Sequence, residues 1–170
     1  MNVWFLDSKA GLKNVPSNRI YNNKSIVESA SATFTFKSDD IKHTYNGNNP
    51  INSADNSIGR WTSFPQIGKK QSVVYSFKKA TRISEIAVYW YRDSSAVNFP
   101  KEWDVEYRDT SGKWKKFPIY LTDSYSVLKN QYNAVHPSGN AITATAVKIN
   151  IVAKPKYAVG ILQVKFTEAK

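Results

Sequence analysis

The residues of this chain whose types and spacing could do chemistry point to binding rather than to catalysis. Its two histidines, His43 and His136, stand in no HxH or HExxH spacing, and no G-x-S-x-G or phosphate-loop motif occurs. Asp104 and Glu106 share one face of an alternating segment, as a pair of acid–base carboxylates would. That face is the polar side of a well-patterned strand, however. We therefore predict surface or hydrogen-bonding roles for these residues and no enzymatic activity.

One loop-like segment, YWYRDSSAVNFP, carries the side chains that a sugar site needs. The apolar face of a pyranose stacks on an aromatic ring, and its hydroxyls pair with planar guanidinium, amide or carboxylate groups. This segment offers both kinds of group in Tyr91, Arg92, Asp93 and Asn98. Other aromatic residues fall in segments where the core pattern does not require them, with a structural role as the alternative for each: Trp61, Phe64, Phe99, Tyr125, Tyr132 and Tyr157.

Strands must hold this segment in place, because period-two alternation dominates the chain. In WDVEYRD, Trp103, Val105 and Tyr107 point to one side while the charged residues between them point to the other. Comparable runs are expected within residues 31–37, 72–77, 86–90, 147–151 and 162–166. Asn-Gly, Asn-Pro, Ser-Gly and Lys-Pro turn signals separate them. The sequence therefore predicts an all-β fold, an antiparallel jelly-roll β-sandwich.

Composition narrows the class of protein further. With 170 residues, 41% of them apolar and 22% charged, the chain has the length of one domain that buries its own core. It has no cysteine, which excludes disulfides, thiolate metal sites and a cysteine nucleophile but does not fix the compartment. No apolar run approaches the roughly 18 residues of a membrane span. We expect no transmembrane segment.

The charge balance is strongly basic. The chain has 24 lysines and arginines against 13 acidic residues, a net charge of +11. Such a surplus favours anionic partners, such as acidic polysaccharide, anionic lipid or nucleic acid. The lysines are scattered, so a solubilising surface is the alternative interpretation. Because no motif of a nucleic-acid-binding fold accompanies the charge, nucleic acid is not an expected partner.

The start of the chain differs in composition from the rest. Residues 1–24 are rich in Asn, Ser and Lys and are predicted to form a linker or N-terminal arm, with the sandwich domain over residues 25–170. The first residues lack the basic and long apolar regions of a signal peptide. A module excised from an exported parent chain would lack them as well. The sequence therefore leaves export open.

The order and spacing of several motifs resemble a known family over roughly residues 28–168. The motifs are YNGNNPINSADNSIGRW, AVYWYRD, WDVEYRD followed by SGKW, TATAVKINI and VGILQVKF. Together they resemble the coagulation factor 5/8 C-terminal (discoidin) domains and the related family 32 carbohydrate-binding modules. More narrowly, they are similar to the modules appended to bacterial glycoside hydrolases.

This resemblance implies a jelly roll whose ligand site lies on loops at one end. In such modules an Arg and a following Asn hold the sugar, a pattern that Arg92 and Asn98 match, and Trp61 or Tyr157 would supply the stacking ring. It implies a non-catalytic module that targets a secreted, periplasmic or cell-surface bacterial glycoside hydrolase to polysaccharide. The basic charge would suit an acidic glycan, such as a pectin or a sulfated chain. The catalytic domain of the same parent chain is the second expected partner.

The same resemblance raises the question of a structural calcium ion. The family often carries one, held by an Asp in an Asp-Gly turn and by a Glu near the C-terminus. Here those positions read Asn46 and Gln163, which supply only neutral oxygens to a cation that prefers anionic ones. We therefore predict weak or absent calcium affinity, and no other cofactor.

Two other roles are compatible with the same family. The domain could be a structural accessory, docked on a catalytic domain without a ligand of its own. It could also adhere to anionic lipid or protein, as animal discoidin domains do. Adhesion of that kind requires exposed apolar loop tips, for which Phe64 and Phe99 are the candidates.

Overall fold

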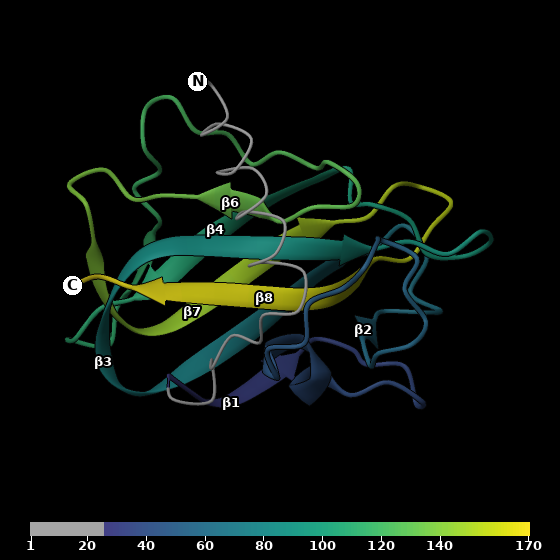
Figure 1. Cartoon of the computed structure of the whole chain (residues 1–170), viewed down its shortest axis with the longest axis horizontal. Helices are drawn as coiled ribbons and strands as arrows, with labels where there is room; N and C mark the ends of the chain where they lie inside the picture. The colour runs from purple at the N-terminus through teal and green to yellow at the C-terminus, as the bar shows by residue number, and fades with distance from the viewer. Residues whose placement is uncertain (1–25) are drawn as a thin grey trace, which may run out of the picture.

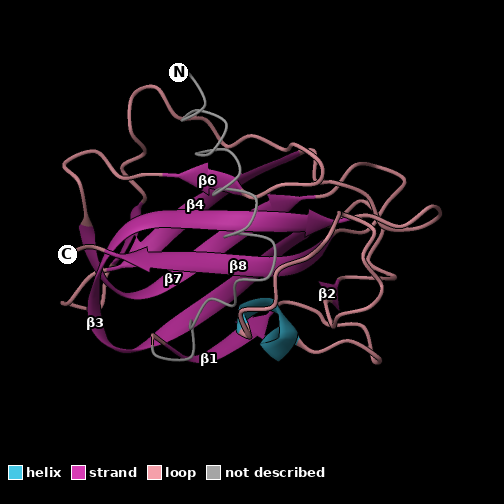
Figure 2. Ribbon diagram, viewed as in Figure 1, coloured by secondary structure: helices cyan, strands magenta, loops and turns pink. Residues whose placement is uncertain are grey.

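The computed structural model describes residues 26–170, so the arm predicted over residues 1–24 lies outside the described residues. Two layers of antiparallel strands face each other across a common core (Figure 1). The helical element in this part of the chain is a short 3-10 turn, η2 (Ile41–Tyr45), which Figure 2 shows. Within the described residues, no helix is long and apolar enough to cross a membrane. The strands are β1 (Val27–Ala32), β2 (Trp61–Thr62), β3 (Lys70–Tyr91), β4 (Glu102–Arg108), β5 (Trp114–Lys116), β6 (Asn133–Val135), β7 (Ile142–Val152) and β8 (Gly160–Glu168).

β3 is the strand that joins the two layers. Its first part pairs with β1 on one side and with β7 on the other, where Tyr75 lies opposite Val147. Its second part pairs with β8 and β6, and there Val88 lies opposite Val164. Between the two parts the register shifts, and residues 78–80 are exposed at a bend. β4 and β5 extend the first layer beyond β7, and β2 extends the second beyond β8.

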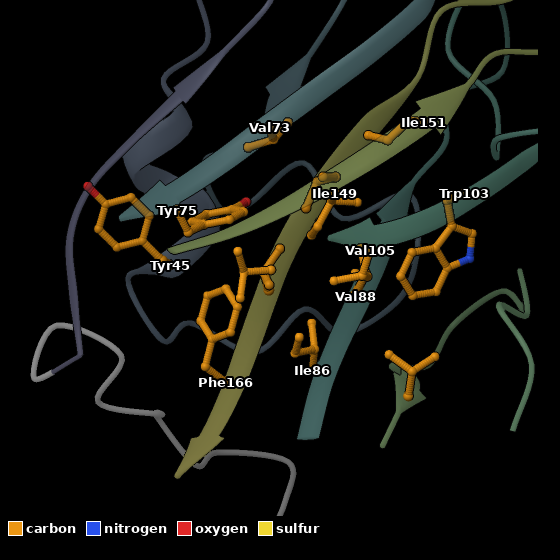
Figure 3. Close-up of a cluster of buried hydrophobic side chains, with 14 of the residues drawn as sticks. Tyr45, Val73, Tyr75, Ile86, Val88, Trp103, Val105, Ile149, Ile151 and Phe166 are labelled. Carbon is orange, nitrogen blue, oxygen red and sulfur yellow. The ribbon is translucent and has the colours of Figure 1, made fainter. Parts of the chain in front are cut away.

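Alternating apolar side chains from both layers form the core (Figure 3). Trp90 and Trp103 meet edge to face across it with ring centroids 5.4 Å apart, a favourable geometry for two aromatic rings. Most of the alternating positions predicted to face inward are buried in this core, which confirms the predicted antiparallel β-sandwich, while Tyr107 is only partly buried. The buried positions include Val73, Tyr75, Ile86, Val88, Trp90, Trp103, Val105, Val147, Ile149, Ile151, Val164 and Phe166.

The strand predicted over residues 31–37 is wrong in its position. β1 ends at Ala32, and the chain then leaves the edge of β3 instead of continuing along it. The backbone N–H of Phe36 donates to the carbonyl of Thr62 in β2, at 3.1 Å. Although the residues of this segment alternate, the later ones form no strand, because they leave β3 and lie beside β2 of the second layer. As a result, Phe36 reaches the loop end of the sandwich.

A small apolar cluster covers the outer face of the second layer. Leu162, which the alternation predicts to share a face with Val164, belongs to this outer cluster instead, because the register between β3 and β8 shifts next to it. It packs there with Tyr91 and Val97, and Phe64 packs against the group. This cluster anchors the start of the loop that follows β3.

His136 links its own segment to β3 and to the loop that carries Asp123. Its Nδ1 lies 2.9 Å from Asp123 Oδ2, and its Nε2 lies 3.0 Å from Glu85 Oε2. Partial burial alone would lower the pKa of His136, but the hydrogen bonds and charges of these two carboxylates outweigh it and raise the pKa above its ordinary value. The predicted hydrogen-bonding role of this histidine is confirmed.

The His136 contacts predict a pH-dependent contribution to stability. Because the folded-state pKa is raised, the contribution is complete below the unfolded-state pKa of about 6.5 and is lost as the pH rises through the folded-state value. We expect His136→Gln to lower the melting temperature more at about pH 5.5 than at about pH 8.5, on either side of the ordinary histidine pKa. Equal losses at the two pH values, measured by thermal unfolding, would contradict this.

Candidate ligand-binding site

Loops from three parts of the chain are tied together at one end of the sandwich. Ser63, directly after β2, donates its N–H to the carbonyl of Val159 at 2.9 Å, and Asn98 donates to Ala158 at 3.0 Å. Val97 forms a parallel bridge with Ala158. Figure 1 shows β2, the end of β3 and the start of β8 at the same end of the molecule. The loops there are therefore held firmly relative to the strands.

A pocket of about 200 Å³ lies among these loops. We call it the aromatic pocket, and its wall combines aromatic rings with one cation and one carboxylate. Phe36 and Phe64 are half-buried and meet edge to face, with ring centroids 5.3 Å apart. The residues that line the pocket are Phe36, Arg60, Thr62, Phe64, Tyr91, Asp93, Ser95, Ala96 and Val97.

Arg60 is held in place on the wall of the aromatic pocket. Its guanidinium lies 4.5 Å from the centroid of the Tyr91 ring, and its Nη1 donates to Asn56 Oδ1 at 3.0 Å. The Tyr91 hydroxyl donates to the same Asn56 oxygen at 2.9 Å, and burial raises the pKa of Tyr91 above its ordinary value. Arg60 Nε lies 3.9 Å from Asp39 Oδ1. These contacts orient the planar guanidinium before any ligand arrives.

Asp93 shapes the rim of the aromatic pocket. Its Oδ1 accepts hydrogen bonds from the backbone N–H groups of Ser95, Ala96 and Val97 at 2.8, 2.8 and 2.9 Å. Partial burial alone would raise the pKa of Asp93, but these bonds outweigh it and hold the pKa below its ordinary value. The three bonds all end on Oδ1. The carboxylate therefore fixes the loop through Oδ1, and Oδ2 takes no part in these three bonds.

This arrangement predicts the effect of removing the Asp93 carboxylate. We expect Asp93→Ala to cost about 1–2 kcal/mol of stability, because three backbone N–H groups lose a charged acceptor in a partly hydrated loop. Asp93→Asn keeps an acceptor oxygen and should cost less than half as much. Urea unfolding of the two variants measures this difference. Equal losses would show that the loop does not depend on these bonds.

The structure contradicts the prediction that Trp61 stacks on a ligand. Its side chain is 0% exposed, and its indole N–H donates to the carbonyl of Phe34 at 2.9 Å. The residue lies in β2, which pairs with β8, and its ring belongs to the core between the layers. A ring without an exposed face offers nothing to a sugar. Trp61 is a structural residue.

The other predicted residues do not form one site. Tyr91 and Asp93 line the aromatic pocket, but Arg92 points to the other side of the segment and lines a different pocket. Asn98 bonds through Oδ1 to the backbone N–H of Phe99 at 2.7 Å. Neither Asn98 nor Tyr157 is among the residues that line the aromatic pocket.

Sequence reasoning did not bring Phe36, Arg60 and Phe64 together in one site. Phe36 was assigned to a strand and Arg60 was not singled out, whereas Phe64 was named among the loop aromatics and as an exposed loop tip. Of the two proposed apolar tips, Phe64 is half-buried in the pocket wall. Phe99 is 9% exposed, with the Arg92 guanidinium 5.5 Å from its ring centroid. Neither residue is a free apolar tip.

The position implied for a structural calcium ion is filled by an amide. Gln163 is 0% exposed, and its Nε2 donates to the carbonyl of His43 at 3.0 Å and to Asn46 Oδ1 at 3.1 Å. It also contacts the Leu162 carbonyl at 3.2 Å, while its Oε1 accepts from the Gly47 N–H at 2.7 Å. The amide hydrogens therefore satisfy the oxygens that a cation would gather.

These residues do not fit a calcium ion. An NH₂ group directed at the oxygens repels a cation, and hard cations bind best to carboxylate oxygens. Among residues 26–170, no group of three or more His, Cys, Asp and Glu side chains could hold a metal. Hydrogen bonds of the Gln163 amide therefore join the loop that carries Asn46 to β8.

A comparison with models of protein families identifies one family. The model of the F5/8 type C domain matches residues 29–162. No sequence among the curated proteins matches the chain. The family 32 carbohydrate-binding module of C. perfringens NanJ, solved in complex with galactose, is 17% identical with a TM-score of 0.64 over 88% of this chain and 97% of that one. A chain of the Streptococcus pneumoniae β-galactosidase BgaA is 13% identical with a TM-score of 0.67, over 85% and 99% of the two chains.

A third solved structure is the family 32 module of AlyQ in complex with 4,5-unsaturated mannuronic acid. It is 15% identical, with a TM-score of 0.57 over 84% of this chain and 96% of that one. At such identities these likenesses establish the fold.

Proposed function

Because the chain belongs to the F5/8 type C domain family, we propose that it is a non-catalytic carbohydrate-binding module and that the aromatic pocket holds the sugar. Its role is to keep a larger bacterial glycoside hydrolase, secreted or periplasmic, near its polysaccharide. The catalytic domain of that parent chain is its second partner.

The observation that carries this proposal is the chemistry of the aromatic pocket. Phe36 and Phe64 offer apolar ring surface, Arg60 offers a planar donor, and Asp93 offers an acceptor, all around about 200 Å³. These are the groups that a pyranose needs: a stacking face for its C–H bonds and paired partners for its hydroxyls. The size suits a single sugar ring, so recognition would concentrate on one residue of a glycan.

Similar structures support the class of ligand. The NanJ module is described in complex with galactose, and the AlyQ module in complex with an unsaturated uronic acid. The net charge of +11 would favour an acidic glycan over a neutral one. Adhesion to lipid through aromatic tips has less support, because Phe64 and Phe99 are not free at the surface.

Affinity electrophoresis in gels that contain neutral or acidic polysaccharides tests the proposal. The panel includes galactans, pectin and its methyl-esterified form, alginate and sulfated host glycans. We expect the module to be retarded by at least one of them, with and without calcium. No retardation on any glycan, together with a stable complex between the module and its catalytic domain, would show that the domain is a structural accessory.

A further inference from the structure

A second pocket lies on the other side of the segment that follows β3. It encloses about 240 Å³, and we call it the basic pocket. Two cationic side chains and several amide and hydroxyl groups line it, and no carboxylate does so among the described residues. The lining residues are Asn52, Ser53, Ala54, Arg92, Phe99, Lys129 and Asn130.

Strand alternation separates the basic pocket from the aromatic pocket. Tyr91 and Asp93 point to one side of the backbone and Arg92 points to the other. The guanidinium of Arg92 lies 5.5 Å from the centroid of the Phe99 ring, which directs it into the basic pocket. The two pockets therefore lie on opposite sides of residues 91–93.

The two cations of the basic pocket have no acidic partner among residues 26–170. The ion pairs of the described chain involve neither Arg92 nor Lys129. The two acidic residues next to the lining residues in sequence make other contacts: Asp93 lines the aromatic pocket and accepts three backbone N–H groups of its own loop, and Asp55 accepts from Ile51 and Ser57. The positive charge in this pocket is thus not neutralised from within the described structure.

Hydrogen bonds of Ser53 hold the wall of the basic pocket in a fixed arrangement. It is 5% exposed, its N–H donates to Asn130 Oδ1 at 2.9 Å, and its Oγ accepts from the Asn130 N–H at 2.7 Å. Its carbonyl accepts from the N–H of Arg92 at 2.9 Å. One buried residue therefore ties three chain segments together around the pocket, so a ligand would not have to pay for ordering them.

We propose that the basic pocket is a second binding site, which takes the carboxylate or sulfate group of an acidic saccharide. A guanidinium and an ammonium that converge on a polar, pre-formed pocket without an internal counter-ion are suited to an oxyanion. The amide groups of Asn52 and Asn130 supply partners for neighbouring hydroxyls. The saccharide part of this inference rests on the proposed function, whereas the anion part rests on this pocket alone.

Calorimetric titration with trigalacturonate and with its methyl ester tests the site. These probes differ in charge but share the sugar ring. We expect the acid to bind more tightly than the ester. Arg92→Gln should weaken binding of the acid about tenfold or more, as the loss of a charge-assisted hydrogen bond would. Lys129→Gln should act in the same direction, and higher ionic strength should reduce both effects. Arg82→Gln removes the same charge at the distant bend of β3 and should change nothing.

Any one of four outcomes would overturn the proposal. The first is no binding of trigalacturonate to the wild-type module. The second is binding that Arg92→Gln and Lys129→Gln leave unchanged while thermal unfolding shows that both variants fold. The third is binding of phosphatidylserine vesicles, lost in the same variants, in place of the saccharide. Retained neutral-glycan binding with no preference for the acid would reject this site but leave the aromatic pocket as the sugar site.

Discussion

Replacing Gln163 with glutamate is expected to destabilise the fold by about 3–5 kcal/mol and to make its stability depend on calcium. The amide now donates to the oxygens of His43, Asn46 and Leu162 from a fully buried position. A carboxylate there has no hydrogen to donate and places a negative charge against oxygen atoms. Calcium would relieve this repulsion, because a hard cation binds both the carboxylate and those oxygens.

Thermal unfolding with millimolar calcium chloride or with a chelator measures this effect. For a domain of this size the loss corresponds to a melting temperature about 10 °C lower without calcium, and we expect calcium to recover much of it. Gln163→Met is the matched control, since it removes the hydrogen bonds but adds no charge. It should be destabilised and should not respond to calcium. A Gln163→Glu variant as stable as the wild type in chelator would contradict our account of this amide.

Changes to the aromatic pocket are expected to abolish most of the sugar affinity without unfolding the domain. Phe64→Ala removes a stacking face and should weaken binding of the best glycan about tenfold, or roughly 1.4 kcal/mol. Arg60→Gln removes the planar cation and should weaken binding about 10- to 100-fold, in line with hydrogen bonds to a charged group. Affinity electrophoresis across a series of polysaccharide concentrations gives both values.

Two controls separate lost binding from lost structure. Arg60 also covers Tyr91 and bonds to Asn56, so Arg60→Lys, which keeps the charge but not the planar donor, should retain part of the affinity. Arg82→Gln, close to the bend of β3 and outside both pockets, should bind like the wild type. If Arg60→Gln and Phe64→Ala keep their full affinity, the sugar does not bind in the aromatic pocket.

β4 and β7 could be predicted because their burial follows simple alternation. Trp103 and Val105 face the core in β4, and Ile149 and Ile151 do so in β7, as the pattern of apolar and polar residues requires. The segment 31–37 shows the same alternation, yet its later part leaves the sheet edge. Pattern alone cannot distinguish a paired strand from a segment that has no neighbouring strand to pair with.

The site was harder to predict because its walls come from distant parts of the sequence. Phe36, Arg60 and Tyr91 meet only because the chain after β1 crosses to β2, which lies at the edge of β8. One signal was available and not used. Continuing the alternation of β3 past Tyr91 would have placed Arg92 and Asp93 on opposite sides, and so in different pockets.

Trp61 shows why residue type misleads at loop ends. It stands beside turn residues and resembles a loop aromatic, but a two-residue strand is enough to turn its ring into the core. For Gln163, residue type alone did not reveal the contacts of the side chain. Its neutral side chain was expected to weaken a metal site, and the structure adds that the amide forms the contacts in the metal's place.

Chemical-shift mapping is the most direct test of the claim that the aromatic pocket holds the sugar. The ¹H–¹⁵N spectrum of the module is recorded while oligosaccharides from the most strongly retarding polysaccharide are added. Our account predicts that the largest shifts fall on the backbone amides of residues 60–64 and 91–97 and on the Arg60 side chain. Shifts centred on another face of the sandwich, with these amides unmoved, would contradict it.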